Sequence, residues 1–186
     1  MSSGRRRAQL RERTSEAHSA LDARVAPLFG AEGYRHYLAG LHTFRAAAES
    51  RLDDAAYPAA FDGWRPTRIA GLLEDDLADL GAPAHPVALA LPERPDPSEA
   101  CGIAYVLEGS AFGARLLIRM AGSLGYDESH GARHLAAQSR TLDNWRHFEA
   151  CLERAEPFDL ASAVTAACAT FDAANAAFER TTHAAT

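Results

Sequence analysis

The sequence predicts a single all-α domain, and three observations predict it. Apolar residues recur three and four positions apart in nearly every segment, which is the period of an amphipathic helix. Proline and glycine cluster between most of these segments, as expected of loops that join helices. The 186 residues are 47% hydrophobic and 24% charged, the composition of one ordinary globular domain. We therefore expect one helical bundle of about six to seven helices over residues 1–186.

The first three helices are expected over residues 10–30, 34–52 and 69–80. The first helix carries a stripe of six residues at helical spacing: Leu10, Thr14, Ala17, Leu21, Val25 and Leu28. The third helix is expected to end at Gly81, because glycine favours the left-handed conformation that ends many helices. Arginines crowd the start of the chain, and we expect residues 1–7 to be a disordered basic arm.

The second half of the chain begins with an irregular segment. Residues 82–97 contain five prolines, and the short apolar run 87–91 is read as a packed loop because a strand there has no evident partner. Asp96, Pro97 and Glu99 predict a helix start with a capping box. The expected helices from there cover about 97–124, 129–154 with a possible break near Ser139, and 157–181.

Charge and cysteine content exclude several classes of protein. The net charge of −6 makes the chain a poor general nucleic-acid binder. Cys101, Cys151 and Cys168 are odd in number and widely spaced, which favours reduced thiols in a cytoplasmic protein over disulfides or a metal site. No apolar run approaches the roughly 20 residues of a membrane span, so no membrane association is expected.

Two glycines stand four positions apart within the helix expected over 97–124. Gly109 and Gly113 share a helix face, and each interior glycine costs about 0.5–1 kcal/mol relative to alanine. Three explanations remain open from the spacing alone. The glycines allow another helix to approach closely, they mark a kink, or they let a flat ligand lie against the backbone.

The histidines offer one candidate ligand. His18 flanks the apolar stripe of the first helix, so its imidazole either pairs within the core or binds something. A neutral imidazole is a good iron ligand when an acceptor fixes its other nitrogen, and the candidates for that acceptor are Glu16, Asp22 or a bridging water. His130 and His134 have a spacing that permits a shared metal, but an exposed helix start is favoured.

Two segments together resemble the heme oxygenase family. They are LRERTSEAHSALD (10–22) and YVLEGSAFGARLLIR (105–119), and the likeness is closest to short bacterial enzymes that supply biliverdin to phytochromes and for related uses. In the family, a Thr-x-x-x-His pattern places the proximal heme ligand, which falls on Thr14 and His18. A Gly-x-x-x-Gly pattern crosses the other heme face, and it falls on Gly109 and Gly113.

Weaker matches add further residues to the implied heme site. An aromatic-Arg pair that directs its arginine to a heme propionate falls on Trp145 and Arg146, and Phe171 matches a residue against the heme pocket. Many members carry an acidic residue where this chain has Ser110, which then becomes the candidate anchor for distal water. Some members carry a basic residue where this chain has Ser15, so Arg11 is expected to take the propionate role, with Tyr105 as a further candidate.

The resemblance implies a cytoplasmic bacterial oxidoreductase that cleaves heme to biliverdin, carbon monoxide and ferrous iron with O2. Heme is then both cofactor and substrate, and His18 is the metal ligand. Electrons come from a ferredoxin or a separate reductase, since no flavin or nicotinamide motif is visible, and a phytochrome or other bilin acceptor is a possible downstream partner. Because of Ser110, a carrier or sensor that binds heme or a bilin without degrading it remains the alternative, followed by a helical scaffold that uses its glycines for packing.

Overall fold

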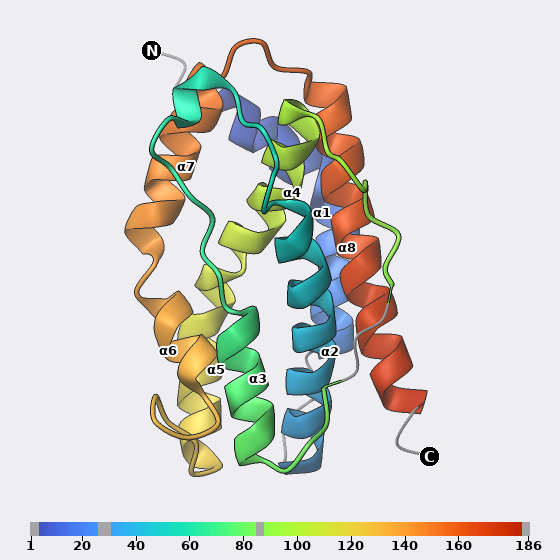
Figure 1. The fold of residues 1–186 in the computed structure, drawn as a ribbon, viewed down its shortest axis with the longest axis vertical. Helices are drawn as coiled ribbons and strands as arrows, with labels where there is room; N and C mark the ends of the chain where they lie inside the picture. The colour runs from blue at the N-terminus through green and yellow to red at the C-terminus, as the bar shows by residue number, and fades with distance from the viewer. Residues whose placement is uncertain (1–3, 26–30, 85–87, 184–186) are drawn as a thin grey trace.

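Eight α-helices make up the regular structure within residues 4–25, 31–84 and 88–183, which are the residues that the computed structural model describes (Figure 1). The all-α prediction is confirmed, and no strand occurs within those ranges. The helices are α1 (Arg5–Val25), α2 (Ala31–Arg51), α3 (Ala70–Asp79), α4 (Pro97–Gly109), α5 (Ala111–Ser123), α6 (Arg133–Ser139), α7 (Leu142–Arg154) and α8 (Leu160–His183). One 3-10 turn, η1 (Ala59–Phe61), lies between α2 and α3.

The start of the chain is helical, so the expected disordered arm is wrong for Arg5 to Arg7. The Arg6 backbone amide donates to Glu153 Oε1 at 2.9 Å, and its guanidinium forms an ion pair with Glu156 at 2.6 Å. The arginines are therefore anchored on the end of α7 by long-range contacts. Residues 1–3, and the end of the first helix expected near Gly30, lie outside the described residues.

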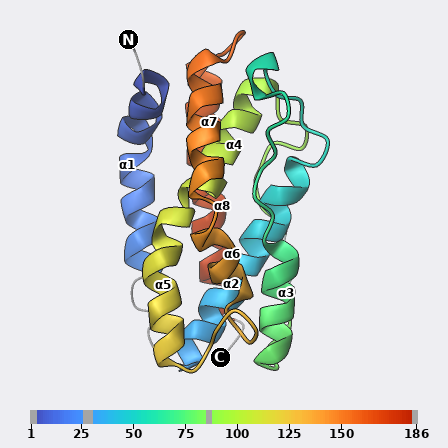
Figure 2. The same cartoon turned by 90° about the vertical axis from the view of Figure 1, so that its left-hand side faces the viewer.

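Helix α8 is the central packing partner of the bundle. It packs against α1, α2 and α4, as Figures 1 and 2 show from two directions. Its buried positions are mostly alanines, which let neighbouring helices approach closely: Ala163, Ala166, Ala167, Ala174 and Ala177. On α4 the same requirement falls on Gly102, because a Cβ built there would lie 2.1 Å from the carbonyl oxygen of Ala163.

Two local predictions for helix ends are confirmed. The Asp96 side chain accepts from the backbone amides of Ser98 and Glu99, and the Glu99 side chain accepts from the Asp96 amide, which completes the capping box. Helix α3 ends before Gly81, whose φ of +61° is the left-handed conformation that glycine adopts without strain.

The helix expected over 97–124 is two helices, because the chain breaks at Ser110 between α4 and α5. The possible break near Ser139 is confirmed, since α6 ends there and α7 begins at Leu142. Residues 85–87 of the proline-rich loop lie outside the described residues, and 88–91 form no strand.

The stretch Pro97–Ser123 is long and apolar enough to cross a membrane by length and composition alone, contrary to our reading of the sequence. Half of its most apolar window is buried inside the bundle, and core helices of soluble proteins pass the same test. The break at Ser110 divides this stretch, so α4 serves as a core helix packed on α8.

A buried contact between His134 and Asp76 joins α6 to α3 and corrects one expectation. The His134 side chain is fully buried, and its Nδ1 lies 2.7 Å from Asp76 Oδ2. His134 is therefore not part of an exposed helix start, whereas His130 is 53% exposed. No group of three or more potential ligands among the described residues is placed to hold a metal ion.

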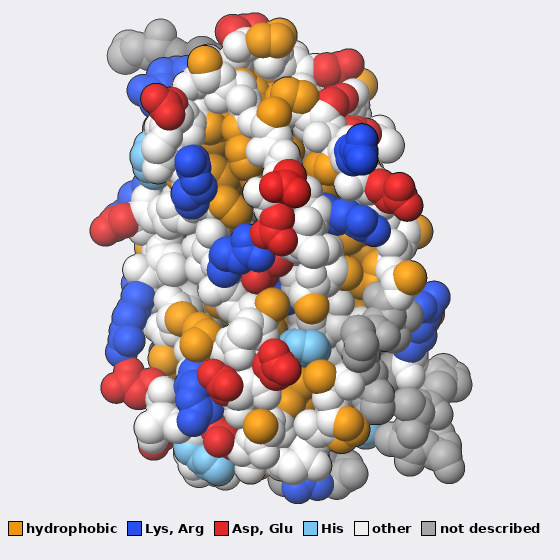
Figure 3. Space-filling model, viewed as in Figure 1, with side chains coloured by type: hydrophobic (Ala, Val, Ile, Leu, Met, Phe, Trp, Pro, Cys, Tyr) orange, Lys and Arg blue, Asp and Glu red, His pale blue; other side chains and the backbone are white. Residues whose placement is uncertain are grey.

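The surface over α2, α3 and α6 carries charges of both signs. Basic and acidic side chains lie interspersed on this face of the bundle (Figure 3). Because neighbouring charges of opposite sign largely cancel, this face attracts a polyanion only weakly.

Candidate functional site

His18 projects from α1 into solvent, with 61% of its side chain exposed. This exposure excludes a core histidine. Its Nδ1 lies 3.0 Å from Asp22 Oδ2, one helical turn further along, so Asp22 is the local partner and Glu16 is not. A carboxylate at Nδ1 favours the proton on that nitrogen and leaves the lone pair of Nε2 free to bind a metal. The arrangement suits an iron ligand.

Phe171 of α8 supports the imidazole from the bundle side. The two rings meet edge to face with their centroids 5.6 Å apart, and Phe171 is buried. Because α1 packs on α8, the Phe171 ring supports the side chain of His18 at the α1–α8 contact. The sequence-predicted pairing of these two residues in one site is therefore geometrically consistent.

Gly109 and Gly113 border open space, not a neighbouring helix. A Cβ built on Gly113 would meet no atom within 4 Å, and one on Gly109 would meet only Trp145 at 3.8 Å, an ordinary contact distance. Close helix packing therefore does not explain either glycine, although it explains Gly102. The kink is observed at Ser110, between the two, and the ligand explanation remains for the bare face.

An apolar surface lies beside these glycines. Phe112 and Leu116 stand one turn apart on α5 and are 56% and 55% exposed. Phe112 meets the buried Trp145 edge to face at 5.7 Å, and Tyr105 lies against the same indole at 5.8 Å. Large exposed apolar side chains that adjoin one another commonly mark a binding surface. Sequence reasoning missed Phe112 and Leu116, because an apolar stripe on a helix does not reveal whether another helix packs against it.

Tyr105 connects this surface to α1. Burial raises the pKa of its hydroxyl, while a side-chain hydrogen bond with Thr14 and the charges of Arg7 and Arg11 oppose that rise. Arg11 is exposed and forms no ion pair with any residue in the described ranges. The structure thus brings Tyr105 and Arg11 together, with the Arg11 cation available to an anionic partner.

Arg146 reaches the same level from α7. Its guanidinium is 72% exposed and pairs with Asp143 of its own helix at 2.7 Å. Helices α1 and α7 run antiparallel, because Arg6 meets Glu153 and Arg7 meets Glu149. One further turn along each helix leads to Arg11 and Arg146, so helical register places these two cations on facing helices at one level.

Ser110 lies at the bend and is held by neighbours. Its hydroxyl donates to the Leu107 carbonyl oxygen at 2.6 Å and accepts from Gln138 Nε2 at 2.7 Å. Gln138 is a buried residue of α6 that sequence reasoning missed. No local pattern signals it, because its partner lies 28 positions away in the chain.

The predicted residues lie on α1, α4, α5, α7 and α8, with Ser110 between α4 and α5. Helix α1 packs on α8 and α7, whereas α5 packs on α6. In Figure 2 both α1 and α5 lie at the left of the bundle, and the exposed side chains of His18, Phe112 and Leu116 belong to these two helices.

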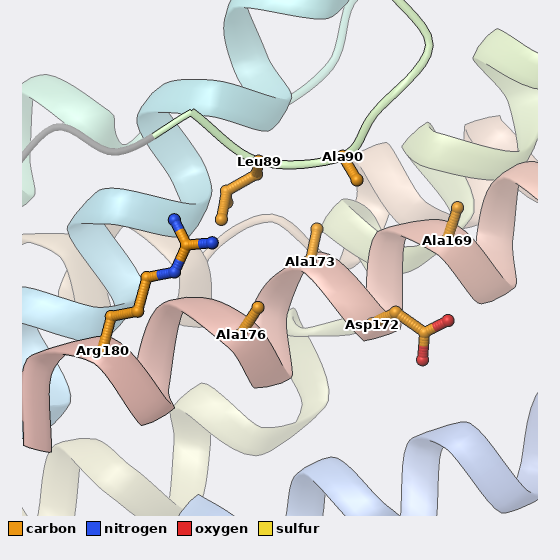
Figure 4. A pocket seen from close by; sticks show the side chains of 7 residues that line it. All are labelled: Leu89, Ala90, Ala169, Asp172, Ala173, Ala176 and Arg180. Carbon is orange, nitrogen blue, oxygen red and sulfur yellow. The ribbon is translucent and has the colours of Figure 1, made fainter.

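A different hollow lies on the opposite flank of α8 (Figure 4). It has a volume of about 340 Å³, its walls are mostly alanine and Leu89, and none of the sequence-predicted site residues lines it. Asp172 turns its carboxylate away from Leu89 and Arg180 in this hollow. It offers no convergent polar groups for chemistry.

Comparisons with known proteins place the chain among relatives. No family model matches the chain. It is 30% identical over 148 residues to heme oxygenase PigA of Pseudomonas aeruginosa, covering 77% of this chain and 75% of that protein. It is 32% identical over 126 residues to a heme oxygenase of Xanthomonas campestris, covering 67% of this chain and 74% of that protein.

The fold also matches a solved structure. The NO- and CO-bound heme oxygenase from Neisseria meningitidis superposes with a TM-score of 0.74 at 26% identity, covering 94% of this chain and 90% of that one. Sequence and fold thus agree over most of the length of each protein compared. The chain belongs to the heme oxygenase family.

Proposed function

We propose that this chain converts heme to biliverdin, carbon monoxide and ferrous iron, using O2 and electrons from a separate donor. The observation that carries the proposal is the exposed His18 with Asp22 on its Nδ1, and the exposed apolar side chains of Phe112 and Leu116 on α5 support it. Family membership supports the same reaction.

The residues present fit heme as the ligand. A flat, largely apolar ring needs an axial nitrogen, apolar walls and cations for its two propionates. His18 offers the nitrogen, and Phe112, Leu116 and Phe171 offer apolar surface. Arg11 and Arg146 offer the cations.

His18 is the proposed metal ligand, and its basicity is set by Asp22. A carboxylate on Nδ1 fixes the ring orientation and makes the opposite nitrogen a stronger donor. When bound, heme supplies both the iron centre at which O2 reacts and the ring that is cleaved. The protein contributes the position of that ring and the shape of the space above it.

Gly109 and Gly113 are the proposed wall above the other heme face. Without side chains they let a flat ring approach the backbone, and they leave room for a small diatomic molecule but for little else. Selection among the bridging carbons of a bound ring would then be steric, set by these two glycines and by the residues that bind the propionates. Tyr105 is proposed to assist Arg11 and Arg146 in binding the propionates, which fixes the rotation of the ring about its axis.

Ser110 is the proposed anchor for water on the glycine side. Its proton is engaged by the Leu107 carbonyl and one of its lone pairs by Gln138, so it retains one lone pair to accept from a water molecule. Proton supply therefore starts from water that Ser110 orients, not from an acidic side chain at that position.

The reaction requires an electron donor and yields a bilin product for another protein to accept. Electrons are supplied by a ferredoxin or a separate reductase, and the bilin is passed to a phytochrome or another bilin acceptor. The free cysteines, two of them buried, support a cytoplasmic location for the enzyme.

Hemin turnover tests the proposal. Purified protein is mixed with hemin and supplied with reductant in air, and we expect the Soret band to disappear while a red-absorbing bilin grows. The matched pair is His18→Ala, which should lose the histidine-ligated spectrum, and His36→Ala on α2, which should keep it. A stable heme complex that yields no bilin would support the carrier instead.

A further inference from the structure

We propose that Gln138 is a positioning residue for ring opening, acting through Ser110 on the glycine wall. This inference rests on the proposed function, since it concerns the wall above the heme. It is carried by the hydrogen bonds that hold the break between α4 and α5, and these bonds involve side chains from two other helices.

The Leu107 carbonyl oxygen is the fixed point of the bend. It accepts from Ser110 Oγ at 2.6 Å and from Arg45 Nη1 at 3.1 Å. Arg45 of α2 is itself buried and held by Glu49 at 2.8 Å and by the Thr67 carbonyl at 2.6 Å. The α4 side of the bend is therefore locked by a charged donor that is satisfied on several sides.

Gln138 supplies a side-chain hydrogen bond that reaches the bend from α6. Its Nε2 donates to Ser110 Oγ at 2.7 Å, and the residue is 4% exposed. Because α6 packs on α5, the amide ties the start of α5 to the helix that supports it. We infer that this bond, together with the packing of α5 on α6, helps to set the tilt of α5 and the position of Gly113.

The same hydrogen bond determines whether the Ser110 hydroxyl can donate or accept toward the site. A hydroxyl has one proton and two lone pairs. The proton is directed to Leu107, one lone pair accepts from Gln138, and one lone pair is left. Ser110 is thus an acceptor toward any water in the site. Without Gln138 the hydroxyl has no second partner to hold its rotamer, so it can turn and donate into the site instead.

The experiment is a double-mutant cycle on the heme-loaded full chain. Gln138→Leu removes the donor, Ser110→Ala removes the acceptor, and the double variant removes both. The readouts are the ratio of bilin isomers and the pH at which the ferric heme spectrum changes to its alkaline form. Losing one buried hydrogen bond is worth about 1 kcal/mol, so we expect about a fivefold change in the isomer ratio for Gln138→Leu. In the Ser110→Ala background Gln138→Leu should have no further effect.

Controls separate positioning from simple loss of stability. Gln9→Leu on α1 makes the same chemical change away from the bend and should leave both readouts unchanged. Gln138→Glu keeps the shape but replaces the donor with an acceptor, so it should shift the isomer ratio in the same direction and decides the matter if the leucine variant does not fold.

Three results have separate meanings. A wild-type chain that releases no bilin refutes the proposed function itself. Wild-type turnover with unchanged isomers and an unchanged spectral transition in the Gln138 variants refutes the positioning role. Effects of Gln138→Leu and Ser110→Ala that simply add would show that Gln138 does not act through Ser110.

Discussion

Gly113 gives the sharpest test, because the structure predicts opposite effects on stability and on activity. In the protein without heme, a Cβ at this position meets no atom within 4 Å, so Gly113→Ala has no steric cost. Alanine in a helix is favoured over glycine by about 0.5–1 kcal/mol. For a chain of 186 residues this corresponds to a rise in Tm of about 1–4 °C.

In the proposed heme complex, the same methyl group would lie on the wall that faces the ring. Displacing the reacting geometry by about 1 Å can reduce the rate about 100-fold. We therefore expect Gly113→Ala to melt at a higher temperature without heme, to bind ferric hemin through His18, and to release bilin far more slowly. A larger side chain such as leucine should stop turnover.

Gly102→Ala on α4 is the matched control, because this glycine faces α8 and not open space. Its Cβ would lie 2.1 Å from the Ala163 carbonyl, so the α4–α8 contact must open at a cost of about 1–3 kcal/mol. Apo melting curves and single-turnover bilin formation distinguish the two glycines. The reasoning fails if Gly113→Ala lowers the apo Tm as Gly102→Ala does, or if it leaves bilin formation at the wild-type rate.

Further predictions concern the proximal side, the propionates and pH. Asp22→Asn should keep heme bound through His18 but make the imidazole a weaker donor to iron, which resonance Raman spectra would show as a lower Fe–His stretching frequency. An unchanged frequency would show that Asp22 does not influence His18. Arg11→Ala and Arg146→Ala should each weaken heme binding about 10-fold or more or mix the bilin isomers, as a lost charge-assisted bond implies, and a variant unchanged in both is not in the site. Burial holds the pKa of His134 below 6.5, so the unfolded chain takes up the proton first and stability falls as pH drops below about 7. In His134→Gln, urea unfolding between pH 7 and 5 should show a slope shallower by up to about 1.4 kcal/mol per pH unit, and an identical slope would contradict the buried neutral form.

The parts of the fold that the sequence predicts well are those whose causes are local. The capping box of Asp96 and Glu99 involves residues three apart, and the helix end at Gly81 is set by its own backbone. The pairing of His18 with Asp22 spans a single turn. Each of these interactions can be read from neighbouring residues, because helix geometry alone brings them together.

The parts that were missed depend on partners far away in the chain. Arg6 looked like part of a solvated arm because Glu153 lies 147 positions away. His134 looked exposed because Asp76 belongs to a different helix, 58 positions away. Hydrophobic periodicity carries no information about such pairs, so only the tertiary fold reveals whether a charged residue is anchored.

The break at Ser110 separates two uses of glycine that the sequence presents as one pattern. Before the break, α4 is fixed in the core, and Gly102 lets it contact α8 through the backbone. After the break, α5 packs on α6 and presents Gly113 to open space. The α4–α8 contact lies before the break, so a change in the tilt of α5 is expected to leave it intact, and the hydrogen bonds at Ser110 are among the contacts that oppose such a change. If α5 forms the proposed wall, substitutions at the bend should therefore alter ring opening without loss of the core on which the fold depends.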